Sequence, residues 1–206
     1  MRSVMMFLTA VLLAVQSASA GQIDVFLPDF NVTPDETGCN VPITARLQSG
    51  GVYDVGGYVL KVGITGSDGC TFAGQAVQPS SNYLLNESDA WDGGSLTNAS
   101  RILEEMTDVS IQSNNIDAGS GDVVRNLVNL PLAFSEIRAG DTFSLSFDAA
   151  NSDDTGLWNW SGNFYGTGGM PTIAWHGGTI TVVPEPSTFV LLLVALATLF
   201  WSKRTR

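Results

Sequence analysis

Short apolar or alternating segments, each closed by turn-forming residues, recur through the interior of this chain. Three occupy residues 22–27, 41–47 and 58–64, and two more occupy residues 142–147 and 178–183. Successive side chains of a strand point to opposite faces, so an alternating segment buries one face and exposes the other. Gly, Asn, Ser, Thr and Asp between the segments favour turns. The pattern predicts an all-β domain, an antiparallel β-sandwich.

The segment 96–111 does not fit this pattern clearly. Leu103, Met106 and Val109 recur at the spacing of one helix face. Residues 108–111, however, alternate like a strand. A short helix and a strand both remain open for this segment.

The N-terminus has the features of a secretory signal peptide. Arg2 precedes an apolar run at residues 4–15, and the small residues Ala18 and Ala20 follow. A basic start, a short apolar run and small residues are the parts of such a signal. We expect residues 1–20 to be removed after Ala20 and the rest of the chain to be exported. An uncleaved N-terminal anchor is the alternative.

The C-terminus carries a second apolar run, at residues 189–201, interrupted only by Thr198 and followed by Lys203, Arg204 and Arg206. As a helix it covers about 20 Å of a hydrocarbon core about 30 Å thick, enough for a marginal single transmembrane helix. Basic residues after a helix hold that end in the cytoplasm. The body of the protein is then expected outside the inner membrane.

Pro184, Glu185 and Pro186 stand directly before this apolar run. The motif, the single helix and the basic tail, together residues 182–206, resemble the PEP-CTERM sorting signal of Gram-negative bacteria. The resemblance implies processing by an exosortase, a transient inner-membrane anchor, and delivery of the body, residues 21–181, to the envelope surface or extracellular matrix. A plain tail anchor is the alternative.

The body carries a second resemblance, to the strands of cohesin-like modules. The segments that carry it are residues 23–28, 41–43, 58–62, 139–148 and 177–182. The resemblance implies a jelly-roll β-sandwich with a binding or structural role that acts through protein contacts.

The body is strongly acidic. Between Gly21 and Val183 there are five basic and nineteen acidic side chains, a net charge of −14. Such a surface repels phosphate backbones, which argues against nucleic acid as a partner. Acidity of this kind also keeps an exported protein soluble.

Cys39 and Cys70 are the only cysteines of the chain. An oxidising compartment favours a disulfide between them, which closes a loop of about 30 residues and contributes roughly 3–4 kcal/mol. Two free thiols are the alternative. A metal site or a nucleophilic cysteine needs a partner, and the single histidine, His176, is distant in the sequence.

An oxygen-rich loop follows the segment 142–147, and oxygen atoms are the ligands that Ca²⁺ prefers. Its candidate ligands are Asp148, Asn151, Asp153 and Asp154. The loop lacks the spacing of an EF-hand, and turns use the same residues, so Ca²⁺ is a weak candidate. Asp89 and Asp92 are weaker still. No other cofactor is indicated.

Aromatic residues gather with asparagine and glycine at residues 157–165. Trp158, Trp160 and Tyr165 are candidates for stacking on sugar rings, and the first two would share one face of a strand. Packing in the core is the competing interpretation.

Motifs for catalysis are absent: the sequence has no Gly-x-Ser-x-Gly and no histidine pair at ligand spacing. We therefore predict a non-enzymatic, exported surface or matrix protein with a structural or adhesive role. A carbohydrate-binding module of the exopolysaccharide matrix is the alternative, and a secreted hydrolase ranks third. The expected partners are an exosortase, the inner membrane for a time, and extracellular polysaccharide or surface proteins.

Overall fold

The computed structural model describes residues 21–85, 90–110, 112–113, 115–148, 155–167 and 170–185, and the helical residues Leu191 and Val194. These described residues form thirteen β-strands. In chain order they are β1 (Gln22–Phe26), β2 (Phe30–Val32), β3 (Gly38–Leu47), β4 (Val52–Gly66), β5 (Cys70–Phe72), β6 (Ser95–Thr97), β7 (Ile102–Val109), β8 (Asn115–Asp117), β9 (Val123–Phe134), β10 (Thr142–Phe147), β11 (Gly156–Asn159), β12 (Thr172–His176) and β13 (Gly178–Val182).

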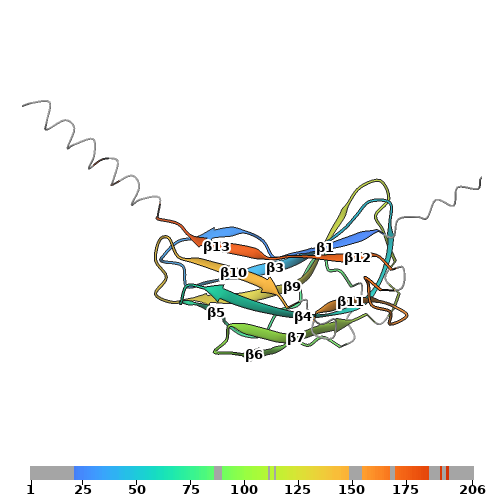
Figure 1. Ribbon diagram of the computed structural model, residues 1–206, viewed down its shortest axis with the longest axis horizontal. Helices are drawn as coiled ribbons and strands as arrows, with labels where there is room; N and C mark the ends of the chain where they lie inside the picture. The colour runs from blue at the N-terminus through green and yellow to red at the C-terminus, as the bar shows by residue number, and fades with distance from the viewer. Residues whose placement is uncertain are drawn as a thin grey trace, which may run out of the picture.

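The strands form two sheets that pack as a sandwich (Figure 1). Sheet A has the order β12-β1-β3-β9-β5. Sheet B has the order β2-β13-β10-β4-β7-β6, and β8 and β11 also pair with β4. The chain changes sheet between β1 and β2 and again between β12 and β13.

The predicted antiparallel arrangement is correct for most strand pairs but wrong for two. β1 pairs with β12 in parallel, and β2 pairs with β13 in parallel. Both pairs arise because the first and last parts of the chain run side by side and cross between the sheets together. At the crossing, a Cβ atom on Gly178 would lie 2.4 Å from the Pro28 carbonyl oxygen, so only glycine fits there.

The core follows the predicted alternation. In β10, Phe143 and Leu145 are buried while Thr142 and Ser144 are exposed. Ile180 of β13 lies opposite Phe143 and is also fully buried. Each such apolar side chain stabilises the fold by roughly 1.5–3 kcal/mol relative to an exposed one.

The segment that sequence patterns left open forms strands β6 and β7. Leu103 and Met106 both point inward, three residues apart, because a bulge lies between them opposite Lys61. Glu105 in this bulge has a φ of 58°, in the left-handed region. The extra residue of a bulge changes the strand period of two into a spacing of three, which mimics a helix face.

The predicted signal peptide and most of the C-terminal apolar segment lie outside the described residues. Within the described residues, no helix has the length and apolar character that crossing a bilayer requires.

Candidate functional site

The outward side of β13, β10, β4 and β7, the sheet B face, carries small hydroxyl side chains in register. Thr181 lies opposite Thr142 on the neighbouring strand. In the next row, Ser144 lies between Thr179 and Thr65. Among the described residues, none of these hydroxyl groups has a hydrogen bond to another side chain. Their donors and acceptors therefore face solvent.

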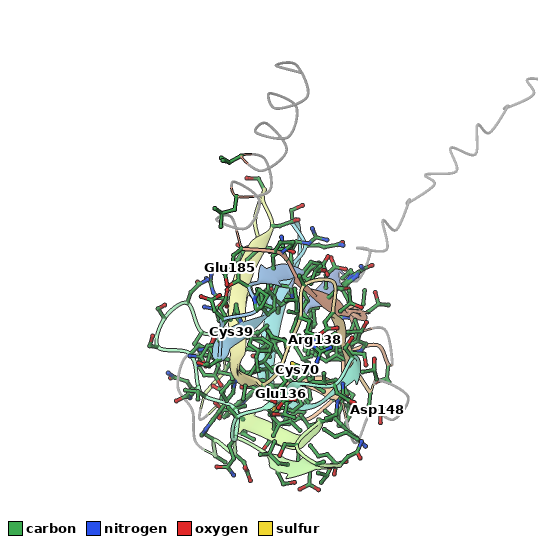
Figure 2. All side chains as sticks on the ribbon, turned by 90° about the vertical axis from the view of Figure 1, so that its left-hand side faces the viewer. Cys39, Cys70, Glu136, Arg138, Asp148 and Glu185 are labelled. Carbon is green, nitrogen blue, oxygen red and sulfur yellow. The ribbon has the colours of Figure 1, made fainter. Side chains whose placement is uncertain are left out.

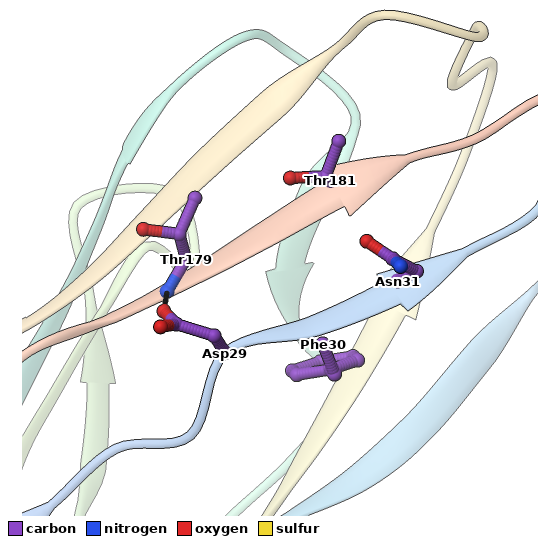
Figure 3. A pocket seen from close by; sticks show the side chains of 5 residues that line it. All are labelled: Asp29, Phe30, Asn31, Thr179 and Thr181. Atoms are coloured by element: carbon purple, nitrogen blue, oxygen red, sulfur yellow. Dashed lines mark hydrogen bonds between the residues drawn. The ribbon is translucent and has the colours of Figure 1, made fainter.

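A shallow groove of about 280 Å³ crosses one edge of this face (Figure 3). Asp29 and Asn31 border it on the β2 side, and Thr179 and Thr181 border it on β13. The Thr179 amide donates a 2.7 Å hydrogen bond to the Asp29 carboxylate, which fixes the crossing of the two strands. The groove is polar and open.

A second hollow, also about 280 Å³, lies over the centre of the face. Gly63 forms its floor, and Ile102 and Ser146 on the neighbouring strands border it. A Cβ atom built on Gly63 would meet no atom within 4 Å. The absence of a side chain at this position creates the hollow.

Lys61 stands at the rim of this hollow between two carboxylates. Its ammonium nitrogen lies 3.2 Å from Asp148 and 3.4 Å from Glu104. The hydrogen bond to Asp148, with support from Glu104, raises the pKa of Lys61 above its ordinary value. With the Glu104 and Asp148 carboxylates and one ammonium group, the rim has an excess of negative charge, so it favours a partner with basic groups.

Of the predicted Ca²⁺ ligands, only Asp148 is described, and it pairs with Lys61. Asn151, Asp153 and Asp154 lie outside the described residues, as does Asp89. In the part of the chain that the structure describes, no three His, Cys, Asp or Glu side chains gather as a metal site. The Ca²⁺ site stays a prediction.

The outward side of β12, β1 and β3, the sheet A face, holds a buried carboxylate that sequence patterns did not indicate. Asp24 is 2% exposed. Arg46 donates to it from Nη2 at 2.7 Å, His176 Nε2 lies at 3.2 Å, and Gln22 and Gln48 donate their amides. Burial alone would raise the pKa of Asp24, but the hydrogen bonds from these four residues, Arg46 foremost, hold it well below its ordinary value.

Phe26 completes this cluster. The His176 ring stacks on it with centroids 4.4 Å apart, and the Arg46 guanidinium lies 5.1 Å from its centroid. His176 is therefore bound to Asp24 and stacked on Phe26, two contacts that hold a side chain in place. This arrangement does not support the hydrolase interpretation, in which His176 would act on a serine or cysteine nucleophile.

A second buried carboxylate, Asp108 of β7, belongs to the packing of the loop after β5. It accepts hydrogen bonds from the Tyr83 hydroxyl and from the Gln78 amide at 3.2 Å. The Tyr83 and Tyr58 hydroxyls are 2.9 Å apart, and the Tyr58 hydroxyl donates to the Leu127 carbonyl. Burial raises the pKa of both tyrosines, which keeps their hydroxyl groups protonated, and the network is structural in character.

The predicted Cys39–Cys70 disulfide is not present in this structure, where both cysteines are free thiols. Figure 2 labels both in a view along the length of the sandwich. Cys39 lies opposite Leu132 and Cys70 opposite Phe134, with β9 between them. Two strand spacings separate Cα atoms by about 10 Å, whereas a disulfide requires less than about 7 Å. Burial raises the pKa of Cys39 to about 11, and the nearby charge of Glu36 adds a smaller effect. Burial also raises the pKa of Cys70 to about 12, with a smaller contribution from Cys39.

The three predicted sugar-stacking residues have different environments. Tyr165 is 6% exposed, which excludes it as an open platform. Trp158 is partly buried, lies opposite Gly57 and makes an edge contact with Phe164 at 5.8 Å. Trp160 is 46% exposed. Of the three, only Trp160 is therefore open to a ligand.

The predicted sorting motif begins where the sandwich ends. The Val183 amide donates a 2.8 Å hydrogen bond to the Val32 carbonyl, so the chain is still attached to β2 at this residue. Pro184 and Glu185 follow without secondary structure, and Pro186 lies outside the described residues.

The chain is similar to several solved structures. The chain is similar to one in a complex of a CaDoc0917 variant with CaCohA2, with a TM-score of 0.55, 14% identity, and coverage of 79% of this chain and 100% of the other. CaCohA2 comes from Clostridium acetobutylicum. A non-cellulosomal cohesin from the archaeon Archaeoglobus fulgidus has a TM-score of 0.52, 13% identity, and coverage of 82% and 96%. At these identities the likeness establishes the fold, so the predicted cohesin-like β-sandwich is confirmed.

No protein-family model matches the chain, and no curated protein matches its sequence.

Proposed function

We propose that this protein is a non-enzymatic adhesive or structural module of the cell surface or extracellular matrix. Its sheet B face would bind a partner protein. The cohesin-like fold supports this role, because one of the similar structures is a complex of two proteins, CaDoc0917 and CaCohA2. The chain itself contributes an open sheet face with solvent-facing hydroxyl groups and a central hollow.

The observation that carries the proposal is the hollow over Gly63. A bare glycine in the middle of a strand weakens that strand, and it often marks a place where another molecule approaches closely. Ile102 provides an apolar contact at the rim, and Lys61, Glu104 and Asp148 surround it with charge. Because carboxylates outnumber ammonium groups around the hollow, we expect the partner to present basic side chains.

The test is quantitative binding of the purified full-length protein to cells of the encoding organism that lack the gene. The variant Gly63→Tyr places a large side chain in the hollow, and its Cβ atom has room because nothing lies within 4 Å of that position. Gly121→Tyr is the matched control, since Gly121 has equally open surroundings. We expect Gly63→Tyr to lose most of the binding and Gly121→Tyr to keep it.

Protease treatment of the cells identifies the class of the partner. Binding that disappears after this treatment supports a protein partner. Binding that survives it, or that Gly63→Tyr leaves at the wild-type level, overturns the proposal.

The route to the surface is part of the same proposal. Residues 1–20 direct export, and an exosortase removes the anchor near Pro184, Glu185 and Pro186. The Val183 amide is hydrogen-bonded to the Val32 carbonyl, so the motif follows in sequence directly after a residue attached to the folded body. Two prolines favour an extended backbone that a protease-like site can hold.

Replacing Pro184 and Pro186 with alanine tests this route in the encoding organism. We expect the variant to remain in the membrane fraction at the mass of the anchored form, while the wild type is released at a lower mass. A variant that is released at the wild-type mass would show that the motif is not used.

A further inference from the structure

The turn from Asn159 to Asn163 presents Trp160 to solvent. Trp160 is 46% exposed, whereas Trp91, Trp158 and Trp175 are partly buried and pack against the core or its neighbours. An exposed indole leaves a large apolar surface in water, which costs free energy unless a ligand covers it. Trp160 is thus more exposed to solvent than the other described tryptophans.

Hydrogen bonds and backbone packing hold the turn that carries Trp160. The Asn159 amide donates to the Asn163 carbonyl, and the Asn163 amide donates to the Asn159 side chain, both at 2.9 Å. The Trp160 amide donates to the Asp54 carbonyl of β4 at 3.2 Å. A Cβ atom on Gly56 would lie 2.7 Å from the Trp160 Cα atom, so the turn rests directly on the β4 backbone. The packing of the turn against β4 therefore determines that Trp160 is exposed.

Uncharged and acidic polar groups surround this turn. Ser161 and Asn163 are exposed on the turn itself. Beside it on β4, the Asp54 carboxylate accepts a 2.9 Å hydrogen bond from Ser113, which in turn accepts one from Asn115. Hydroxyl, amide and carboxylate groups next to an aromatic face form the combination that binds the hydroxyls and the apolar face of a pyranose ring.

We infer that Trp160 and the Asn159–Asn163 turn form a binding subsite for a neutral polysaccharide, with the indole stacked on one sugar residue. The negative charge of the protein favours a neutral glycan over an anionic one. The body carries a net charge of −14, and this turn has no basic side chain, so a polyanionic glycan is repelled. Because the turn is already ordered, binding a sugar would not require the turn to become ordered first.

Affinity electrophoresis of the purified full-length protein tests this subsite. The gels contain neutral polymers (hydroxyethylcellulose, dextran, a mannan or a galactan), and one gel contains anionic alginate. We expect retardation by at least one neutral polymer and none by alginate. Trp160→Ala should weaken that binding roughly tenfold, the equivalent of about 1.4 kcal/mol, and Trp160→Phe should weaken it less.

Val124→Ala is the matched control, because Val124 is also an exposed apolar side chain, at 47%, but lies on sheet A. It should bind like the wild type. Lack of retardation by every neutral polymer, retardation by alginate alone, or wild-type binding of Trp160→Ala would each overturn the inference. If Trp160→Ala loses polysaccharide binding but keeps the protease-sensitive binding to cells, the sugar subsite and the proposed protein-binding face are separate sites.

Discussion

The two outer faces of the sandwich use polar side chains in opposite ways. On the sheet A face, Asp24 is buried beneath donors from Arg46, His176 and two glutamines. On the sheet B face, hydroxyl groups such as those of Ser144 and Thr179 have no comparable network among the described residues. A ligand on the first face would have to replace existing hydrogen bonds, whereas one on the second would meet solvent-facing groups. We therefore propose that the sheet A face contributes stability and that the sheet B face binds the partner.

Asp24→Ala should produce the largest loss of stability. It leaves Arg46 and His176 without their shared acceptor. Asp24 is buried but both of its partners are 43% exposed, so we expect a cost of about 2 kcal/mol, between the values for exposed and for fully buried pairs. Urea unfolding measures this change. Asp148→Ala is the matched control, because this carboxylate also pairs with a cation but is 47% exposed, and an exposed pair contributes about 1 kcal/mol or less. Equal losses for the two variants would contradict the assignment.

Acid should weaken the sheet A face by a smaller amount. The pKa of Asp24 is lowered in the folded state, so its contribution is complete above the ordinary pKa and declines as the pH falls below about 4. The free-energy difference between wild type and Asp24→Asn should therefore shrink by about 1–2 kcal/mol between pH 5 and pH 2.5. Unfolding at several pH values measures it, and a difference that stays constant would show that Asp24 is not held ionised.

His176→Ala should cost less again, about 1 kcal/mol, because it removes one hydrogen bond and one ring contact while Arg46 still pairs with Asp24. Thermal unfolding measures the change. Since His176 is the only histidine of the chain and lies on the sheet A face, binding to cells and to polysaccharide should be unaffected. A loss of either binding would place His176 in recognition rather than in stability.

The alternation of apolar and polar residues within single segments was sufficient to predict much of the fold. The prediction of a strand at residues 142–147 agrees with β10, because alternation there is undisturbed. It was insufficient for β7, where the bulge at Glu105 changes the spacing of the inward residues. It also missed β9, in which Pro131 and two asparagines interrupt the apolar pattern of a central strand.

Contacts between distant segments could not be predicted. Asp24 and His176 are 152 residues apart and meet only because β1 and β12 pair in parallel. The cysteine prediction failed for the same reason, since the position of β9 between Cys39 and Cys70 depends on the strand order. Exposure of Trp160 likewise depends on how its turn rests on Gly56.

The smallest change in stability should come from the sheet B face. A double variant, Ser144→Ala with Thr179→Ala, removes two hydroxyl groups that lie opposite each other. Because neither has a side-chain hydrogen bond among the described residues, the free energy of unfolding should change by less than about 0.5 kcal/mol. Binding to untreated cells should nevertheless fall several-fold, since a partner loses two hydrogen bonds at a desolvated interface. Clear destabilisation of this variant, or binding at the wild-type level, would contradict the proposal that the sheet B face serves binding and the sheet A face stability.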